Sequence, residues 1–194
     1  MYKRQGEICS NSLDPIYYSP NPSYSPNNLL YSLDEEQFSG NYTVNLNAIL
    51  PSNGNLDAIE YSNDAIEFQS SNKFENITPG DWTFYARNKY GCGELVSVNL
   101  QILDYPHVFT PNGDGINDTW NILDTTINQN TRITIYDRYG KILDQIYSFS
   151  EGWDGEYTDG VQAPSNDYWF IANYLDPLSG EFKSFTASFT LKRK

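Results

Sequence analysis

The feature that most constrains the fold of this chain is a regular alternation of short apolar stretches and turn residues. Gly, Pro, Asn and Ser interrupt the sequence about every 8–12 residues, a spacing typical of β-sandwiches and barrels. The stretches between them follow a two-residue hydrophobic period, and none follows the 3.6-residue period of an amphipathic helix. Tyr, Phe, Thr, Ile and Val, which favour strands, are plentiful. The sequence therefore predicts an all-β protein with no helix beyond a single turn.

In the first half of the chain the alternation is clearest over residues 41–50. Tyr42, Val44, Leu46 and Ala48 fall on one face there, which predicts a half-buried strand. Further strands are expected at residues 58–62, 66–69, 82–88 and 95–103. Residues 74–81 are interpreted as a corner, and the proline-rich residues 11–28 as a loop or an extended edge segment.

The second half begins where Asp104-Tyr-Pro106 breaks the strand pattern and a new register starts at His107. We place a domain boundary there and predict two antiparallel Ig-like β-sandwich domains in tandem, residues 1–104 and residues 105–194. Strands of the second domain are expected at residues 120–123, 131–136, 141–147, 167–174 and 182–191. A hairpin turn is expected at residues 137–140.

The charge balance excludes several classes of function. The chain has 25 acidic and 12 basic side chains, for a net charge of −13, so bulk charge cannot bind a nucleic acid. The single histidine, His107, leaves no His-rich metal centre and no histidine pair for acid–base catalysis. No apolar run approaches the roughly 20 residues that span a bilayer, so no direct membrane insertion is expected. The first residues lack the apolar stretch of a signal peptide, and we expect an expression boundary or the cut edge of a longer protein there.

No pattern of catalytic residues stands out, and we predict that the chain is not an enzyme. No serine lies in a nucleophile-elbow pattern, and no glycine-rich loop is suited to phosphate. Asp154 and Asp159 are the nearest approach to the carboxylate pair of a glycosidase, and they straddle a turn-rich loop. The Tyr and Trp residues that look exposed suggest another alternative, a carbohydrate-binding module.

Residues 112–118, Asn-Gly-Asp-Gly-Ile-Asn-Asp, form the richest cluster of oxygen ligands. Asn112, Asp114 and Asp118 could offer side-chain oxygens to Ca²⁺, with a backbone carbonyl near Ile116. The loop departs from an EF-hand, because its first ligand would be Asn and no Glu occupies the twelfth position. The alternative is a turn in which Asn and Asp side chains accept hydrogen bonds from their own backbone. Calcium is thus a candidate ligand, and no cofactor is required.

An ordered set of motifs in the second half resembles a known family. The motifs are FTPNGDGIND (109–118), IYDRYG (135–140), WDG (153–155), DYWF (167–170) and FTLKR (189–193). Their order, spacing and position at the end of the chain resemble the gliding motility-associated C-terminal domain of Bacteroidota, the type B sorting domain of the type IX secretion system. The resemblance covers roughly residues 105–194.

Residues 58–103 resemble the Ig-like repeats that precede such domains in large adhesins. This resemblance rests on EYSND (60–64), FQSSN (68–72), FENITPG (74–80) and NKYGC (88–92). The two resemblances together imply a C-terminal secretion signal and surface-targeting module, attached to a longer exported cargo such as an adhesin. The product would pass through the periplasm and the outer membrane to the cell surface or the extracellular space.

The resemblance also implies partners and recognition residues. The expected partners are the type IX translocon and an outer-membrane shuttle or anchor protein. The candidate recognition residues are basic: Arg138, Lys192, Arg193 and Lys194. For the basic end of the chain, the alternative is a solvated and frayed terminus. In an exported protein Cys9 and Cys92 are expected to form a disulfide, the alternative being two free buried thiols.

Two motifs also have purely structural interpretations. Trp153-Asp-Gly155 is expected to be a core tryptophan followed by a turn, with a sugar-stacking platform as the alternative. Residues 137–140 are interpreted first as hairpin chemistry. In that turn Arg138 could pair with Asp137 or Asp144, or face a partner.

Overall fold

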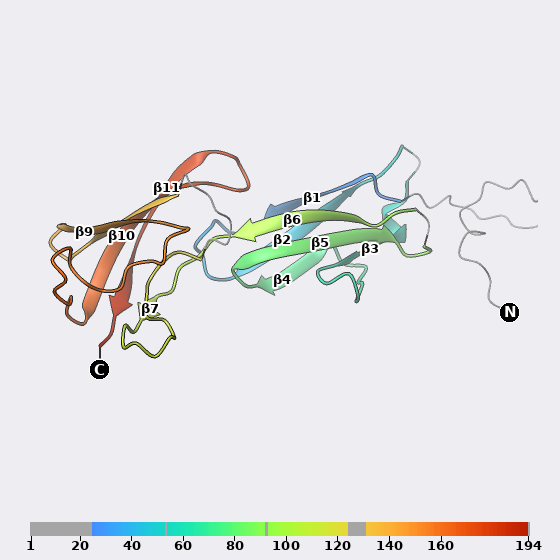
Figure 1. Ribbon diagram of the computed structural model, residues 1–194. Coiled ribbons are helices and arrows are strands. Elements are labelled where there is room, and N and C mark those ends of the chain that lie inside the picture. The colour runs from blue at the N-terminus through green and yellow to red at the C-terminus, as the bar shows by residue number, and fades with distance from the viewer. Residues whose placement is uncertain (1–24, 53, 92, 124–130, 194) are drawn as a thin grey trace, which may run out of the picture. The chain divides into compact units, whose positions relative to one another are not determined.

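Strands make up nearly all of the regular structure in the computed structural model (Figure 1). The structure describes residues 25–52, 54–91, 93–123 and 131–193. Within these ranges the helical structure is a single 3₁₀ turn, η1 (Leu56–Ala58). The all-β, sandwich-like architecture predicted from the sequence is therefore confirmed. The chain divides into two compact units, residues 1–36 with 41–100 and residues 37–40 with 101–194.

The first unit is built on two three-stranded sheets, with strand orders β1-β2-β4 and β3-β5-β6. The strands are β1 (Asn28–Leu33), β2 (Tyr42–Ile49), β3 (Ile59–Ser62), β4 (Lys73–Ile77), β5 (Gly80–Asn88) and β6 (Val96–Ile102). The β1–β2, β2–β4 and β3–β5 pairs are antiparallel.

The core of the first unit follows the predicted alternation. Tyr42, Val44, Leu46 and Ala48 of β2 are all buried, while the intervening residues are partly or fully exposed. Burying a large apolar side chain of this kind contributes about 1.5–3 kcal/mol. Hydrophobic burial of alternate residues therefore explains why β2 forms where the sequence predicts it.

Two local predictions in this unit are wrong, and one strand was missed. Residues 74–81 are not only a corner, because β4 pairs with β2 despite its mostly exposed side chains. Residues 66–69 form no strand: Gln69 makes a single bridge to Tyr61, and Asp64 fixes the preceding turn. The missed strand is β1, which pairs with Val44–Ile49 of β2.

The second unit is built on one five-stranded sheet with the order β7-β11-β10-β8-β9. The strands are β7 (Val108–Phe109), β8 (Arg132–Tyr136), β9 (Ile142–Tyr147), β10 (Asn166–Leu175) and β11 (Phe182–Leu191). All neighbours are antiparallel except β7, which lies parallel to the end of β11. The predicted hairpin turn is confirmed: the Gly140 N–H donates to the Asp137 carbonyl at 3.0 Å.

In the part that the structure describes, loops and isolated bridges cover the inner face of this sheet. Trp120 and Trp153 exchange two backbone hydrogen bonds of 2.8 Å, and this bridge replaces the strand predicted at residues 120–123. The Trp120 ring stacks on Phe189 of β11, with 3.8 Å between ring centroids. Both tryptophans are buried, so rings carried by loops form a large share of this core.

Residues 37–40, which join β1 to β2 in the sequence, belong to the second unit. The Phe38 ring is only 8% exposed, stacks on Phe185 at 4.4 Å and meets the Tyr174 ring edge-on at 5.2 Å. The backbone is fixed too: Phe38 N–H donates to the Leu103 carbonyl at 3.0 Å, and Leu103 N–H donates to Gln37 Oε1 at 2.7 Å. The core of the second unit thus includes a side chain from outside residues 105–194.

Candidate functional site

Arg193 holds the C-terminal end of the chain against two loops of the second unit, the one after β7 and the one between β9 and β10. Its Nε donates to the Ala163 carbonyl at 3.0 Å, Nη2 to Gly155 at 2.8 Å and Nη1 to Pro111 at 3.2 Å. Its backbone N–H donates to Ser165 Oγ at 2.8 Å. A planar guanidinium has donors in fixed directions, so one side chain can satisfy carbonyls from several loops. We call this set of hydrogen bonds the Arg193 clamp.

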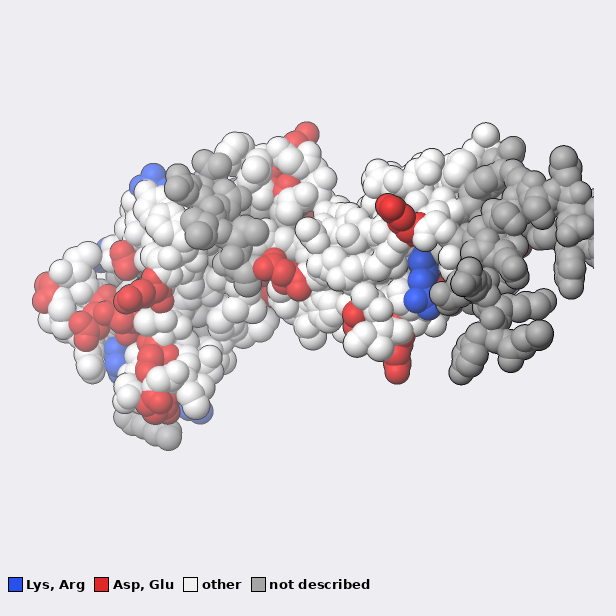
Figure 2. All heavy atoms as spheres, turned by 45° about the vertical axis from the view of Figure 1, so that its right-hand side comes forward, with Lys and Arg blue, Asp and Glu red and all other residues white. Residues whose placement is uncertain are grey.

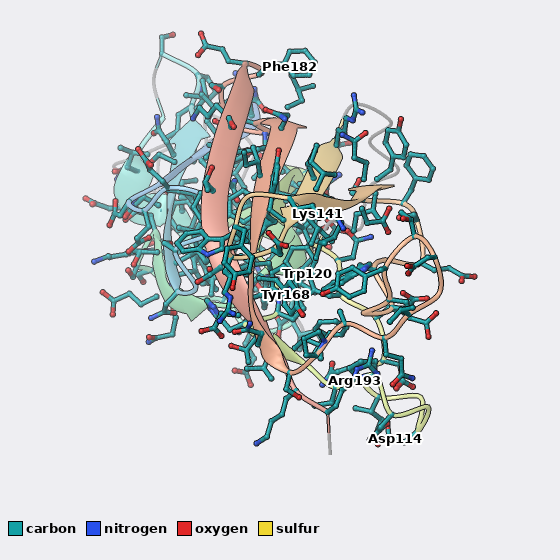
Figure 3. All side chains as sticks on the ribbon, turned by 90° about the vertical axis from the view of Figure 1, so that its left-hand side faces the viewer. Asp114, Trp120, Lys141, Tyr168, Phe182 and Arg193 are labelled. Carbon is teal, nitrogen blue, oxygen red and sulfur yellow. The ribbon has the colours of Figure 1, made fainter. Side chains whose placement is uncertain are left out.

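The clamp brings together motifs that lie far apart in the sequence. Pro111 belongs to FTPNGDGIND, Gly155 to WDG and Arg193 to FTLKR. Figure 3 shows Arg193 and the Asp114 loop at the same end of the unit. The sequence predicted these motifs separately but not that they meet, because no spacing rule reveals which carbonyls a guanidinium will reach.

Gly155 is required by the close packing at the clamp. Its φ of +81° is favourable for glycine, and an added Cβ would lie 2.7 Å from Leu191 Cδ1 and 3.0 Å from Arg193 Nη2. Its carbonyl accepts a second hydrogen bond, from the Ala163 N–H at 2.9 Å. The third residue of WDG is therefore fixed by backbone conformation and by the space that Arg193 occupies.

The tryptophan of WDG is a core residue. Trp153 is 1% exposed, and its indole N–H donates to the Glu156 carbonyl at 2.7 Å. Asp154 Oδ1 accepts from the Glu156 N–H at 2.9 Å and closes the turn. The predicted core tryptophan and turn are confirmed, and the sugar-stacking alternative at Trp153 is wrong because the ring is buried.

Tyr168 of β10 supports the same region from inside the core. Its hydroxyl donates to the Pro164 carbonyl at 2.7 Å. Burial, followed by the charge of Tyr157, raises the pKa of Tyr168 to about 12, although the positive charge of Arg193 opposes the shift. The phenol therefore stays a neutral hydrogen-bond donor over the whole physiological pH range.

The loop of residues 112–118 is organised around the Asp118 carboxylate. Asp118 Oδ1 accepts from the N–H groups of Gly113 at 2.7 Å and Asn112 at 2.9 Å, and Oδ2 accepts from Gly115 at 2.6 Å. The bonds from Gly113 and Gly115 are the main reason that the pKa of Asp118 lies below its ordinary value. Asn112 Oδ1 and Asp114 Oδ1 each accept from a backbone N–H two residues on, at 2.9 Å. These contacts fit the turn that the sequence analysis gave as the alternative to calcium.

Calcium binding at Asn112, Asp114, Ile116 and Asp118 stays a prediction. Three of the carboxylate oxygens in the loop already accept backbone N–H groups, so a cation would have to share or displace these donors. Across the described ranges, no group of three or more His, Cys, Asp or Glu side chains could hold a metal ion. A melting curve recorded with Ca²⁺ and with a chelator tests the prediction directly.

The other predicted recognition residues have different surroundings. Arg138 Nη2 donates to the Tyr139 hydroxyl at 2.6 Å and its guanidinium lies 4.8 Å from the centre of that ring, while Asp137 accepts from the Tyr139 N–H. Lys192 has an exposed side chain, and its N–H donates to the Phe109 carbonyl at 3.0 Å. Up to Arg193 the terminus is therefore held in place rather than frayed. Lys194, Cys9 and Cys92 lie outside the described residues, so the disulfide stays a prediction.

The surface gives little support to a catalytic site. On the face drawn in Figure 2, acidic side chains are spread over both units and Lys and Arg are sparse. A shallow hollow of about 300 Å³ beside the β8–β9 hairpin includes Lys141, Tyr157 and Asp159 in its lining, but not Asp154. The carboxylate pair suggested by the sequence therefore does not line this hollow.

No helix among the described residues has the length and apolar character needed to cross a membrane.

One protein family matches the second half of the chain. Residues 103–187 match the family described as CHU_C type IX secretion signal domain. Over these residues the chain matches a type IX secretion signal domain, in agreement with the motif resemblance. A domain of this kind implies recognition by the type IX secretion machinery and export through the outer membrane, to the cell surface or the extracellular space. The family is a secretion signal rather than a catalytic family.

Three solved structures with some similarity to the chain are distant from it. Dimeric latent PorU from Porphyromonas gingivalis aligns with 88% of this chain at 12% identity and a TM-score of 0.28, covering 20% of its own length. The M60 catalytic domain of Clostridium perfringens ZmpB with its CBM51 domains aligns with 88% at 13% identity and a TM-score of 0.27, covering 16% of that protein. A tetra-tandem repeat of a large adhesion protein aligns with 89% at 16% identity and a TM-score of 0.20, covering 50% of it. No curated protein matches the chain.

Proposed function

We propose that this chain is the C-terminal export module of a longer secreted cargo, such as an adhesin. The type IX translocon reads the second unit, and an outer-membrane shuttle or anchor protein then receives the product. The first unit, which resembles an Ig-like adhesin repeat, connects the signal to the cargo. The observation that carries this proposal is the match of residues 103–187 to a type IX secretion signal domain.

The geometry supports a folded signal rather than a linear one. Three of the five motifs of the second unit meet at Arg193, whose guanidinium donates to carbonyls that lie 82, 38 and 30 residues earlier in the chain. Such an arrangement exists only after the domain has folded. A translocon that reads this surface therefore distinguishes a folded domain from an unfolded one with the same sequence.

A reporter fusion tests the proposal. The whole chain is placed behind a signal peptide and a fluorescent reporter in a bacterium with an active type IX system. We expect the reporter at the cell surface or in the medium. The whole chain is needed because Phe38, which packs in the core of the second unit, lies outside residues 105–194.

Two controls make the result decisive. The same fusion in a strain without the translocon should remain in the periplasm, and so should a reporter that carries the signal peptide alone. Retention of the whole-chain fusion in the competent strain, with the protein folded and intact, would overturn the proposal.

Carbohydrate binding is not proposed as a second function. Trp120 and Trp153 are 0% and 1% exposed, so neither ring can stack on a sugar. Trp169 is exposed, as are Tyr90, Tyr139 and Tyr147, but exposed apolar side chains are common on protein surfaces and do not by themselves indicate a sugar site.

A further inference from the structure

The five-stranded sheet of the second unit has two edges, formed by β11 with β7 and by β9. β7 pairs only with Thr190 and Leu191 of β11. The rest of β11, from Phe182 to Phe189, pairs with β10 on one side only. An edge of this kind presents unpaired backbone groups, which natural proteins usually block.

The register shows which residues of β11 face outward at this edge. The Thr190 N–H donates to the His107 carbonyl of the segment leading into β7, at 2.8 Å, so even-numbered residues of β11 point away from β10. Ser184, Thr186 and Ser188 therefore direct their N–H and C=O groups to the open side. All three residues are exposed, and no described residue makes a backbone hydrogen bond to them on that side.

The opposite edge is protected. The β8–β9 register turns the Gln145 N–H away from β8, and it donates instead to its neighbour Asp144 Oδ1 at 2.7 Å. A charged side chain at an edge strand also opposes pairing with another strand. By contrast, β11 has no charged residue and no proline from Ser184 to Leu191. The two edges of one sheet thus differ in their readiness to accept a further strand.

The unpaired backbone groups of the open edge indicate what kind of partner can bind there. Alternating N–H and C=O groups over residues 184–188, about 13 Å at roughly 3.3 Å per residue, are matched by the backbone of an extended segment. β7 already joins the same edge in this way, through Thr190 and Lys192. A second copy of the chain is a poor occupant because each copy carries a net charge of −13 and the two would repel. A neutral or basic strand from another protein has no such penalty.

We propose that residues 184–188 of β11 accept an extended, neutral or basic segment of the outer-membrane secretion machinery as an additional strand of the sheet. This inference rests on the proposed export function and specifies how the partner is held. Backbone hydrogen bonds supply the contact, which explains how side chains as small as Ser184, Thr186 and Ser188 can form a binding edge.

A proline at the open edge tests the inference. Thr186→Pro removes an N–H that β10 does not use, so the β10–β11 ladder keeps its hydrogen bonds while the outer side loses a donor. In the whole-chain reporter fusion, we expect Thr186→Pro to lower the exported reporter at least tenfold. Thr186→Val keeps the N–H and should export within twofold of the unchanged chain. Gln145→Pro makes the same change at the protected edge and should also stay within twofold.

The outcomes separate this inference from the function on which it rests. Normal export of folded Thr186→Pro, with the unchanged chain also exported, would overturn the edge-strand inference and leave the proposed function standing. Failure of the unchanged chain to be exported would overturn both. Thermal unfolding of each purified variant checks folding, and Ser184→Pro, nearer the start of the strand, replaces Thr186→Pro if the latter unfolds. Equal loss of export in Gln145→Pro would also contradict the inference.

Discussion

In the first unit, the strand β2 buries Tyr42, Val44, Leu46 and Ala48 in strict alternation, whereas in the second unit the largest buried rings belong to loops. Trp120 and Trp153 lie outside the named strands, and their backbones pair with each other. The first unit has two sheets to bury apolar faces, while the second has one sheet whose inner face is covered by loops.

This difference shows where specific sequence is needed. A sheet face requires only apolar residues at alternate positions, and many sequences meet that condition. A loop that must enter a core requires particular rings, turn residues and glycines, and it must satisfy its own backbone groups. The match to a secretion signal domain accordingly falls on residues 103–187, where loops supply much of the core.

The largest expected effect comes from removing a loop-borne ring. Trp120→Ala should lower the free energy of unfolding of the second unit by about 3–5 kcal/mol, because it leaves a cavity beside Phe189. Chemical denaturation followed by circular dichroism measures this change. The control is Trp169→Ala on the outer face, where the ring is 48% exposed and we expect a loss of roughly 1 kcal/mol or less. Equal losses would mean that the loops do not carry the core.

A second substitution tests whether the upstream segment is part of the second unit. Phe38→Ala should cost about 3 kcal/mol, because its buried ring contacts Phe185 and Tyr174. Hydrogen exchange should show the lost protection in β10 and β11 rather than in β2. Leu30→Ala, 48% exposed on β1, is the control and should leave that exchange unchanged. Loss of protection confined to β1 and β2 would contradict the assignment of Phe38 to the second unit.

The Arg193 clamp should have an intermediate effect. Arg193→Ala removes charge-assisted hydrogen bonds to three carbonyls and should cost about 2–3 kcal/mol. Arg193→Lys keeps the charge but not the planar set of donors, so it should recover only part of that loss. Lys192→Ala, with an exposed side chain, should be neutral for stability. Thermal unfolding measures all three, and full recovery by lysine would show that charge alone holds the terminus.

Local sequence patterns predict the strands correctly where such a pattern determines the structure. The bounds of β11 and the buried face of β2 both follow from two-residue alternation, and the prediction was correct at both. The strand β4 was missed because its exposed side chains carry no such pattern, and its pairing with β2 depends on tertiary structure. Local propensity cannot reveal a strand that is held mainly by its neighbour's backbone.

The site was predicted less completely than the fold. The motifs were found from their resemblance, and Arg193 was named for its charge, but its hydrogen bonds to Pro111, Gly155 and Ala163 were not foreseen. Phe38 was missed because a single phenylalanine in a loop gives no sign of the core it enters. Long-range contacts of this kind depend on how loops meet in space, and spacing along the chain does not encode them.

The smallest expected effect concerns a loop held by an aspartate carboxylate, a feature that both units contain. Asp64 in the first unit and Asp118 in the second each accept hydrogen bonds from backbone N–H groups of their own loop. The bond from the Ile66 N–H is the leading cause of the lowered pKa of Asp64. For Asp118 the leading cause is the bond from the Gly113 N–H. A carboxyl group whose pKa is lowered on folding stabilises the fold above its unfolded pKa, and this contribution is lost as the pH falls through the folded value. Both loops should therefore hold at pH 5 and open as the pH falls below the ordinary value of 3.8. The amide shifts of Ile66 and Gly113 in an NMR titration report the two openings.

The two units can be compared directly, because the same substitution can be made at the aspartate of each loop. Asp64→Asn and Asp118→Asn both replace a carboxylate with a weaker acceptor and should lower the melting temperature by similar small amounts. If the loop of residues 112–118 contributes to recognition, only Asp118→Asn should reduce export of the reporter fusion. Equal export of the two variants would mean that this loop serves stability alone. An equal reduction would instead show that export responds to the stability of either unit. The difference between a core built by loops and one built by strands would then have no effect on secretion.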